Sequence, residues 1–177
     1  KRIAKASPRE KLYIKALEAY INADKKKSKA RNDAYTKAME NLILEYPNDL
    51  EAKAFLAVLL SNSRSASTSY IAAEALLQDI FAVNPKHPAH HYRIHLWDHR
   101  KPETALTSAA RCGQSAPSIA HMWHMPGHIY SRLKRYDDAV WQQAMHLAAE
   151  LPADQQAEFT AQSYSGDIHS DFGRAVS

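Results

Sequence analysis

Hydrophobic residues recur every three or four positions through most of this chain, which is the spacing of one face of an α-helix. The first such pattern includes Leu12, Ala16 and Tyr20. It follows the stretch SPRE at residues 7–10, which reads as a capping box with a proline at the first helical position. We therefore expect the first helix to begin at Pro8.

Three more helical patterns fill the rest of the first half. They cover, in order, residues 30–46, 49–62 and 70–83. The first of them stops at Pro47 and the last stops before Pro85, since proline ends a helix that reaches it. Asn48 with Glu51 three residues later repeats the capping signal, so Asn48 is the expected cap of the third helix.

The second half of the chain is more regular and fits a period of 34 residues. In a unit that begins at Ala120, the fourth, eighth, eleventh and twentieth positions are Trp123, Gly127, Tyr130 and Ala139. The preceding unit, which begins at residue 86, carries Ala89, Tyr92, Ala105 and Pro117 at the fourth, seventh, twentieth and closing positions. His87 then aligns with His121, and His90 with His124. The two units are therefore expected to form successive helix pairs.

This pattern resembles the tetratricopeptide repeat (TPR), with the signature W-x2-L-G-x2-Y followed by A, F and P. It departs at Pro126, where leucine is usual, at Gln143, where phenylalanine is usual, and at Pro152, which closes the unit one residue late. The resemblance implies an all-α, TPR-like right-handed superhelical array in a single domain over residues 1–177. The implied helix pairs and C-terminal helix lie at about residues 8–47, 49–85, 86–119, 120–152 and 153–164.

Four segments carry a narrower resemblance. They read SPREKLYIKAL, YPNDLEAKAFLA, HPAHHYRIH and HMPGHIYSRL. They are similar to bacterial TPR proteins with an H-M-P-[GS]-H-I motif, some of which are fused to a thioredoxin-like domain. The resemblance therefore implies, as an alternative, a role as the accessory repeat domain of a larger redox protein.

In TPR proteins the first helix of each pair lines a concave groove. By resemblance, the groove positions here are His87, His90, Ile94, Trp97, Asp98, His121, His124, His128, Ser131 and Arg132. A helical wheel places the last five of these within an arc of about 100°, with Trp123 and Tyr130 on the other side. Five histidines are therefore expected to converge on one patch, with His91 and His95 at its flank.

Three interpretations of these histidines stay open. In the first, they form an ordinary polar helix surface. In the second, they line a groove for a protein or peptide partner, with Trp97 as the anchor and Asp98 and Arg132 as polar contacts. In the third, they bind Zn or Cu through pairs four residues apart, using His87 with His91 and His124 with His128. We expect the second, a non-enzymatic binding or scaffold module without a cofactor.

Other chemistries find little support in the sequence. Ser131, His128 and Asp98 are the residue types of a catalytic triad, but a helical face lacks the strand-turn-helix elbow that such enzymes use. The single cysteine, Cys112, excludes an intrachain disulfide and is expected to fill the core. A lone thiol leaves the compartment open between cytoplasm and periplasm, and nothing in the sequence fixes the oligomeric state.

Charge and hydropathy narrow the range of partners. The net charge is +4, and a local basic run lies in the polar stretch DKKKSKARND, residues 24–33. This stretch lacks interleaved aromatic residues, so we expect no nucleic-acid binding. The sequence also contains no apolar run long enough to span a membrane.

Pro126 and Gly127 interrupt the histidine-rich stretch HMWHMPGHIY, residues 121–130. The eighth position of a TPR unit favours a small residue, which accounts for Gly127. If the helix begins near Ser118, Pro126 removes a hydrogen bond to the carbonyl of Met122 and is expected to kink the helix. The alternative is a helix that begins at Pro126.

Overall fold

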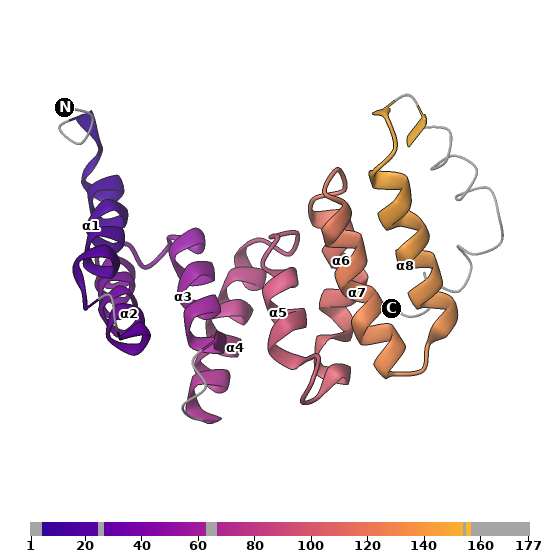
Figure 1. Cartoon of the computed structure of the whole chain (residues 1–177), viewed down its shortest axis with the longest axis horizontal. Helices are drawn as coiled ribbons and strands as arrows, with labels where there is room; N and C mark the ends of the chain where they lie inside the picture. Colours follow the sequence, from indigo (N-terminus) through magenta and orange to yellow (C-terminus); the bar gives the residue numbers. More distant parts are fainter. Residues whose placement is uncertain (1–4, 25–26, 63–66, 154, 157–177) are drawn as a thin grey trace. The chain divides into compact units, whose positions relative to one another are not determined.

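The computed structural model describes residues 5–24, 27–62, 67–153 and 155–156. These residues form eight α-helices and one 3-10 helix, and no β-strand occurs among them (Figure 1). In chain order they are α1 (Pro8–Asn22), α2 (Ser28–Glu45), α3 (Leu50–Asn62), α4 (Ser67–Val83), α5 (His90–Trp97), η2 (Pro102–Ala105), α6 (Leu106–Ser115), α7 (Ala120–Arg132) and α8 (Tyr136–Ala149). The expected all-α class is confirmed.

The chain divides into two compact units, Lys1–Val83 and Asn84–Ser177. We call them the N-terminal unit and the C-terminal unit. Neighbouring helices pack in pairs within each unit: α1 with α2, α3 with α4, α5 with α6, and α7 with α8. The predicted C-terminal helix at residues 153–164 lies mostly outside the described residues. Among the helices described, none combines the length and the apolar character that a membrane crossing needs.

The N-terminal unit begins with the predicted capping box. The Ser7 hydroxyl accepts a hydrogen bond from the Glu10 N–H, and the Glu10 carboxylate accepts one from the Ser7 N–H. These bonds satisfy N–H groups that the first turn of α1 leaves without a helical partner. One core cluster of the unit lies where α1, α2 and α3 meet and consists of Ala16, Met39, Leu42, Ala52 and Leu56.

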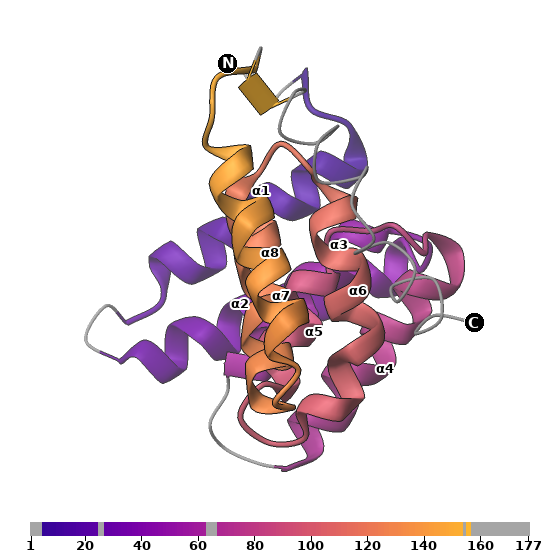
Figure 2. The same ribbon diagram turned by 90° about the vertical axis from the view of Figure 1, so that its right-hand side faces the viewer.

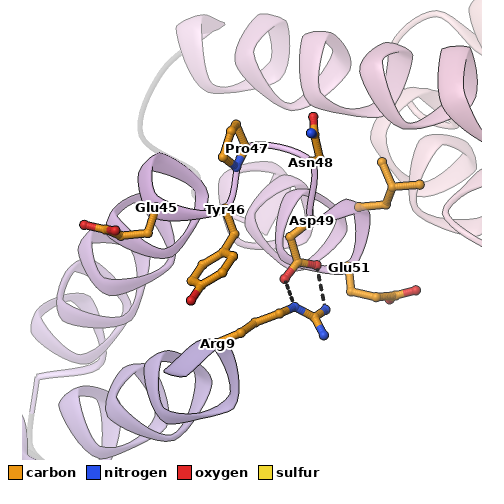
Figure 3. A pocket seen from close by; sticks show the side chains of 8 residues that line it. Arg9, Glu45, Tyr46, Pro47, Asn48, Asp49 and Glu51 are labelled. Atoms are coloured by element: carbon orange, nitrogen blue, oxygen red, sulfur yellow. Dashed lines mark hydrogen bonds and ion pairs between the residues drawn. The ribbon is translucent and has the colours of Figure 1, made fainter. Parts of the chain in front are cut away.

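The cap of α3 is Asp49 and not Asn48 as expected, because the helix begins one residue later. Asp49 Oδ1 accepts the Ala52 N–H at 3.2 Å. The same carboxylate accepts two hydrogen bonds from the Arg9 guanidinium, at 2.6 and 3.0 Å (Figure 3). It also accepts a hydrogen bond from the Tyr13 hydroxyl at 2.9 Å. Asp49 therefore caps α3 and ties it to the start of α1.

In the C-terminal unit α5, α6, α7 and α8 pack in succession, and α5 also touches α7. Figures 1 and 2 both show α7 and α8 side by side. The core between α5, α6 and α7 consists of Ile94, Ala105, Ala109, Cys112, Met122, Met125, Ile129 and Tyr130. Cys112 is fully buried in this core, in agreement with its expected structural role. The contact between α5 and α7 brings their histidine-bearing faces together.

Gly113 of α6 lies directly against the Trp123 side chain of α7. A Cβ atom at Gly113 would lie 2.1 Å from the ring of Trp123, which is far inside van der Waals contact. The indole N–H of Trp123 donates to the Pro117 carbonyl at 2.9 Å, and its ring meets Trp141 edge-on at 5.7 Å. Because glycine has no side chain, residue 113 leaves room for this indole ring.

The helix α7 begins at Ala120, two residues after the expected start at Ser118, and runs through Pro126. The alternative in which the helix begins at Pro126 is therefore wrong. Pro126 has no N–H, so the Met122 carbonyl lacks its usual helical donor. The kink stays a prediction.

A backbone motif ends α7. Lys134 has a φ of 59°, in the left-handed region that usually favours glycine. The Arg135 N–H donates to the Tyr130 carbonyl at 2.9 Å, and the Lys134 N–H donates to the Ser131 carbonyl at 3.1 Å. These two bonds are those of a Schellman motif. They turn the chain directly into α8.

Candidate functional site

The structure separates the predicted groove residues into a buried and an accessible group. His87, His90 and Asp98 are buried, whereas His121, His128 and Arg132 are exposed. Trp97 and His124 are partly buried. The eight residues therefore do not form one continuous open surface.

His90 is part of the fold's internal hydrogen bonding. Its side chain is packed so tightly that the residue is only 1% exposed. Nδ1 lies 3.0 Å from the Ser108 hydroxyl of α6, and Nε2 lies 2.9 Å from the Pro85 carbonyl. Burial lowers the pKa of His90 to about 4, so the ring is neutral at neutral pH. With both nitrogens engaged, His90 links α5 to α6 and to the chain before it.

His87 lies in the turn that leads into α5. Its Nδ1 accepts the Ala89 N–H at 3.1 Å. This contact organises the backbone just before the helix, in the manner of side-chain caps elsewhere. His87 and His90 are thus placed at the start of α5, where they support its geometry.

Trp97 lies at the last turn of α5 and packs against the core of the C-terminal unit. Its position on the helix predicts an anchor that faces the groove. The helical wheel gave the direction of the side chain but not the position of α6 and α7, which cover part of it.

Asp98 and Arg132, both expected in the groove, are brought together. The Arg132 guanidinium donates to Asp98 Oδ1 and also lies 2.6 Å from Nδ1 of His99. The two charged residues are 34 positions apart and occupy the same position in successive units. This ion pair fastens the end of α7 to the end of α5.

Five histidines of α5 and α7 form a continuous cluster, which we call the histidine cluster: His91, His95, His121, His124 and His128. Neighbouring ring centroids lie 4.7, 5.0, 5.8 and 4.8 Å apart along the order 95, 91, 121, 124 and 128. The convergence that the sequence predicted is therefore present for the α7 residues, with His91 and His95 in place of His87 and His90.

Two pairs in this cluster approach most closely. Nε2 of His91 lies 2.9 Å from Nε2 of His95, and Nε2 of His128 lies 3.1 Å from Nε2 of His124. Both pairs are separated by four residues, which stacks side chains on one helix face. In neutral rings, one nitrogen of such a pair donates and the other accepts.

Three of the five rings in the histidine cluster have a lowered pKa, which favours their neutral form. Burial, followed by the charges of His95 and His121, lowers the pKa of His91 to about 4. Burial is also the main cause that lowers the pKa of His95 and His128, although the carboxylate of Asp98 opposes it. Neutral imidazoles carry free lone pairs at neutral pH, which is the form that binds metals.

His146 of α8 joins the edge of the cluster, and the sequence analysis missed it. Its ring lies 5.5 Å from that of His124. Its Nδ1 bonds to the Ala120 carbonyl at 3.0 Å, so one nitrogen is already used at the first residue of α7. The TPR register gave no signal for His146, because the register assigns the groove to the first helix of each pair.

Three histidines satisfy the spacing of a metal site. One ring nitrogen from each of His91, His95 and His121 lies within 4.8 Å of the others. In the part of the chain that the structure describes, this is the only such group of three histidine, cysteine or carboxylate residues. The set proposed from the sequence shares only His91 with it, since His87, His124 and His128 are not members.

An open hollow lies beside the other end of the cluster, between α7 and α8. Its volume is about 720 Å³. It is lined by His124, Gly127, His128, Ser131, Arg132, Tyr136, Ala139, Val140 and Gln143. Tyr136 is 62% exposed and Val140 is 69% exposed. The α7 wall is thus mainly polar, whereas the α8 wall carries exposed apolar side chains.

A second hollow, of about 430 Å³, lies in the N-terminal unit beside Arg9 and Asp49 (Figure 3). Its two central charges bind each other. Burial alone would raise the pKa of Asp49, but the hydrogen bonds from Arg9, the Ala52 N–H and Tyr13 outweigh it and hold the pKa below its ordinary value. The polar groups here are engaged in holding α1 to α3.

Cys112, Asp98 and His128 are each buried or in contact with other side chains. Burial raises the pKa of the Cys112 thiol to about 12, so it is protonated at neutral pH and enclosed in the core. Of the triad residue types Ser131, His128 and Asp98, the Asp98 carboxylate contacts Arg132 and His99. His128 instead contacts His124.

Comparison of the chain with protein-family models, curated proteins and solved structures gave no match. The TPR resemblance therefore rests on the residues and spacings quoted above.

Proposed function

We propose that this chain is a non-enzymatic binding module that holds a protein or peptide partner in the hollow between α7 and α8. The observation that carries the proposal is the exposure of Tyr136 and Val140 directly beside His128 and Arg132. Apolar side chains surrounded by polar groups are typical of protein interaction sites.

The chemistry of the two walls defines the partner. An apolar side chain of the partner packs on Tyr136 and Val140, which are the largest exposed apolar residues of the hollow. A carboxylate beside it meets His128 and the accessible part of the Arg132 guanidinium, whose side chain is 42% exposed despite its pair with Asp98. The net charge of +4 favours the same acidic partner.

The TPR resemblance supports this proposal at the level of the fold. Stacked helix pairs in repeat proteins provide extended binding surfaces. The anchor differs from the one expected from sequence. Tyr136 and Val140 take the place of Trp97, which packs against the core.

The test is selection of binding peptides from a random library displayed on phage, followed by measurement of Kd for synthetic peptides by fluorescence polarisation. We expect the selected peptides to share a large apolar residue next to Asp or Glu. Val140→Asp should weaken binding at least about tenfold, because it places a carboxylate where the apolar anchor and the acidic group approach. His124→Ala should weaken binding by a smaller factor.

Leu44→Asp is the matched control, since Leu44 is a similarly exposed apolar residue of α2, in the N-terminal unit. It should leave the Kd unchanged. Selection of no consensus peptide, or equal binding by wild type and Val140→Asp, would overturn the proposal. Circular dichroism confirms that each variant is folded before its Kd is interpreted.

A further inference from the structure

We propose that His91, His95 and His121 form a binding site for a divalent transition-metal ion, with Zn²⁺ as the preferred probe. This site is independent of the partner-binding hollow, because none of the three residues lines it. It joins α5 and α7. His91 and His95 were expected at the flank of the predicted groove, and His121 within it.

The distances fit a metal ion after small movements. Zn²⁺ binds histidine nitrogens at about 2.0–2.1 Å, so two nitrogens on a tetrahedral ion lie about 3.3 Å apart. The Nε2 atoms of His91 and His95 are 2.9 Å apart and need to separate only slightly. The third nitrogen, from His121, lies within 4.8 Å of both and approaches by rotation of an exposed side chain.

The fold explains why the three rings meet. His91 and His95 are four residues apart on α5, so their rings project from the same face. His121 is the second residue of α7, and the packing of α5 against α7 sets its ring edge-on to His91 at 5.0 Å. Two ligands thus come from one helix and the third from its neighbour.

The ligand type selects the class of ion. Three imidazoles without a thiolate suit Zn²⁺, Cu²⁺ and Ni²⁺, whereas Ca²⁺ and Mg²⁺ require oxygen ligands. Three protein ligands leave a coordination position for water or for an external group. A bound ion also connects α5 to α7, so it stabilises the folded C-terminal unit by mass action.

The second close pair, His124 with His128, is the internal competitor for the ion. It has a similar nitrogen separation of 3.1 Å, but no third ligand of the described residues joins it in a group of three. A third ligand strengthens binding, so the ion is expected at His91, His95 and His121 first.

Isothermal titration calorimetry of the full, untagged chain with Zn²⁺ tests the proposal. We expect one tight equivalent per chain. His95→Ala and His121→Ala should each weaken it at least about tenfold, because loss of a ligand exceeds the effect of losing an outer hydrogen bond. His99→Ala is the matched control, since His99 is an exposed histidine outside the group, and should leave the affinity unchanged.

Thermal unfolding followed by circular dichroism gives a second readout. Zn²⁺ should raise the melting temperature of wild type and of His99→Ala but not of the triple alanine variant at residues 91, 95 and 121. Mg²⁺ should raise none of them. The apo melting temperatures establish that each variant is folded.

Three results would overturn the proposal. The first is the absence of any heat of Zn²⁺ binding by folded wild type. The second is weak binding reduced equally by His99→Ala and His95→Ala, which would mean that all surface histidines share the ion. The third is loss of binding in His128→Ala with none in His95→Ala, which would move the ion to the other pair. Peptide binding by a zinc-free chain is unaffected by any of these results.

Discussion

The Arg9–Tyr13–Asp49 cluster of the N-terminal unit and the histidine cluster of the C-terminal unit are both polar, but they differ in what their groups leave available. In the first, opposite charges and a hydroxyl satisfy one another around a carboxylate that also caps α3. In the second, identical imidazole rings face one another, and each close pair shares a single contact between ring nitrogens. We call the first cluster, Arg9, Tyr13 and Asp49, the joint, because it holds α1 to α3. The histidine cluster is instead a surface that can bind a ligand.

Polar clusters in helical proteins differ in how far their own donors and acceptors satisfy one another. In a cluster that mixes donors and acceptors, the groups satisfy one another's hydrogen bonds, so removing one of them lowers the free energy of unfolding. In a cluster of identical imidazoles, the rings satisfy one another's hydrogen-bonding groups less fully. Removing such a ring is therefore expected to weaken ligand binding. Substitutions in the helix core, in the joint and in the histidine cluster should therefore lower the free energy of unfolding by decreasing amounts.

The largest effect is expected at Gly113, where α6 packs against the Trp123 ring of α7. Gly113→Ala places a methyl group 2.1 Å from the Trp123 ring and forces α6 and α7 apart. The free energy of unfolding should fall by about 3 kcal/mol or more, as for overpacked cores. Urea denaturation followed by circular dichroism measures it.

Gly127→Ala is the control for this prediction. The nearest heavy atom to its Cβ outside the local helix is the Ala139 carbonyl oxygen at 3.9 Å, so a methyl group fits. Alanine favours helix over glycine by about 1 kcal/mol, and the variant should be as stable as wild type or more so. Equal destabilisation by both substitutions would contradict the packing described for Gly113.

Trp97→Ala should destabilise the C-terminal unit by about 2–3 kcal/mol, because the indole packs on the core cluster. The same denaturation experiment measures the loss. A variant of wild-type stability with weakened peptide binding would instead restore Trp97 as the exposed anchor that the sequence suggested.

The joint is tested with two substitutions of Asp49. Asp49→Ala removes both the helix cap and the partner of Arg9 and Tyr13, and should cost about 2 kcal/mol of unfolding free energy. Asp49→Asn keeps a cap acceptor and should cost about half as much. Equal stability of the three proteins in urea would mean that the joint is not structural.

The joint also predicts a pH dependence. The pKa of Asp49 is lower in the folded chain than its ordinary value of 3.8, so its ionised form contributes stability at neutral pH. This contribution is lost as the pH falls below about 4 through the folded-state pKa. Wild type should therefore lose more stability than Asp49→Asn between pH 5 and pH 2 (about the range over which the carboxylate titrates), as measured by urea denaturation at each pH.

The smallest effect on folding is expected in the histidine cluster itself. His95→Ala should change the free energy of unfolding of the metal-free chain by no more than about 0.5 kcal/mol, since His95 is exposed. Thermal and urea denaturation in a chelator provide the measurement. A loss comparable to that of Asp49→Ala would mean that the imidazole contacts are structural, and the contrast between the two clusters would disappear.

Local signals in the sequence were sufficient for most helices. The capping box at Ser7 and the proline at Pro8 fixed the start of α1. The cap of α3 was displaced by one residue, because Asn48 and Asp49 are both good caps. The choice between them depends on Arg9, whose position 40 residues earlier in the chain becomes relevant only after folding.

Tertiary contacts limited the prediction of the site. The period of 34 residues placed His90 beside His124, yet Ser108 of α6 engages the ring of His90 in the interior. Periodicity also singled out Gly127 as the position that needs a small residue, whereas the tight contact belongs to Gly113 and Trp123. The helical wheel and the 34-residue period describe one helix at a time. They carry no information about the side chains of neighbouring helices.

The Schellman turn after α7 has a consequence for how this surface can evolve. Its hydrogen bonds join backbone atoms only, so the side chains of His128, Tyr136 and Val140 play no part in setting the turn. Mutations at these positions can change which ligands the surface recognises while the two helices keep their connection. The specificity of the hollow is therefore separable from its architecture, as in a scaffold suited to diversification by natural selection or by library design.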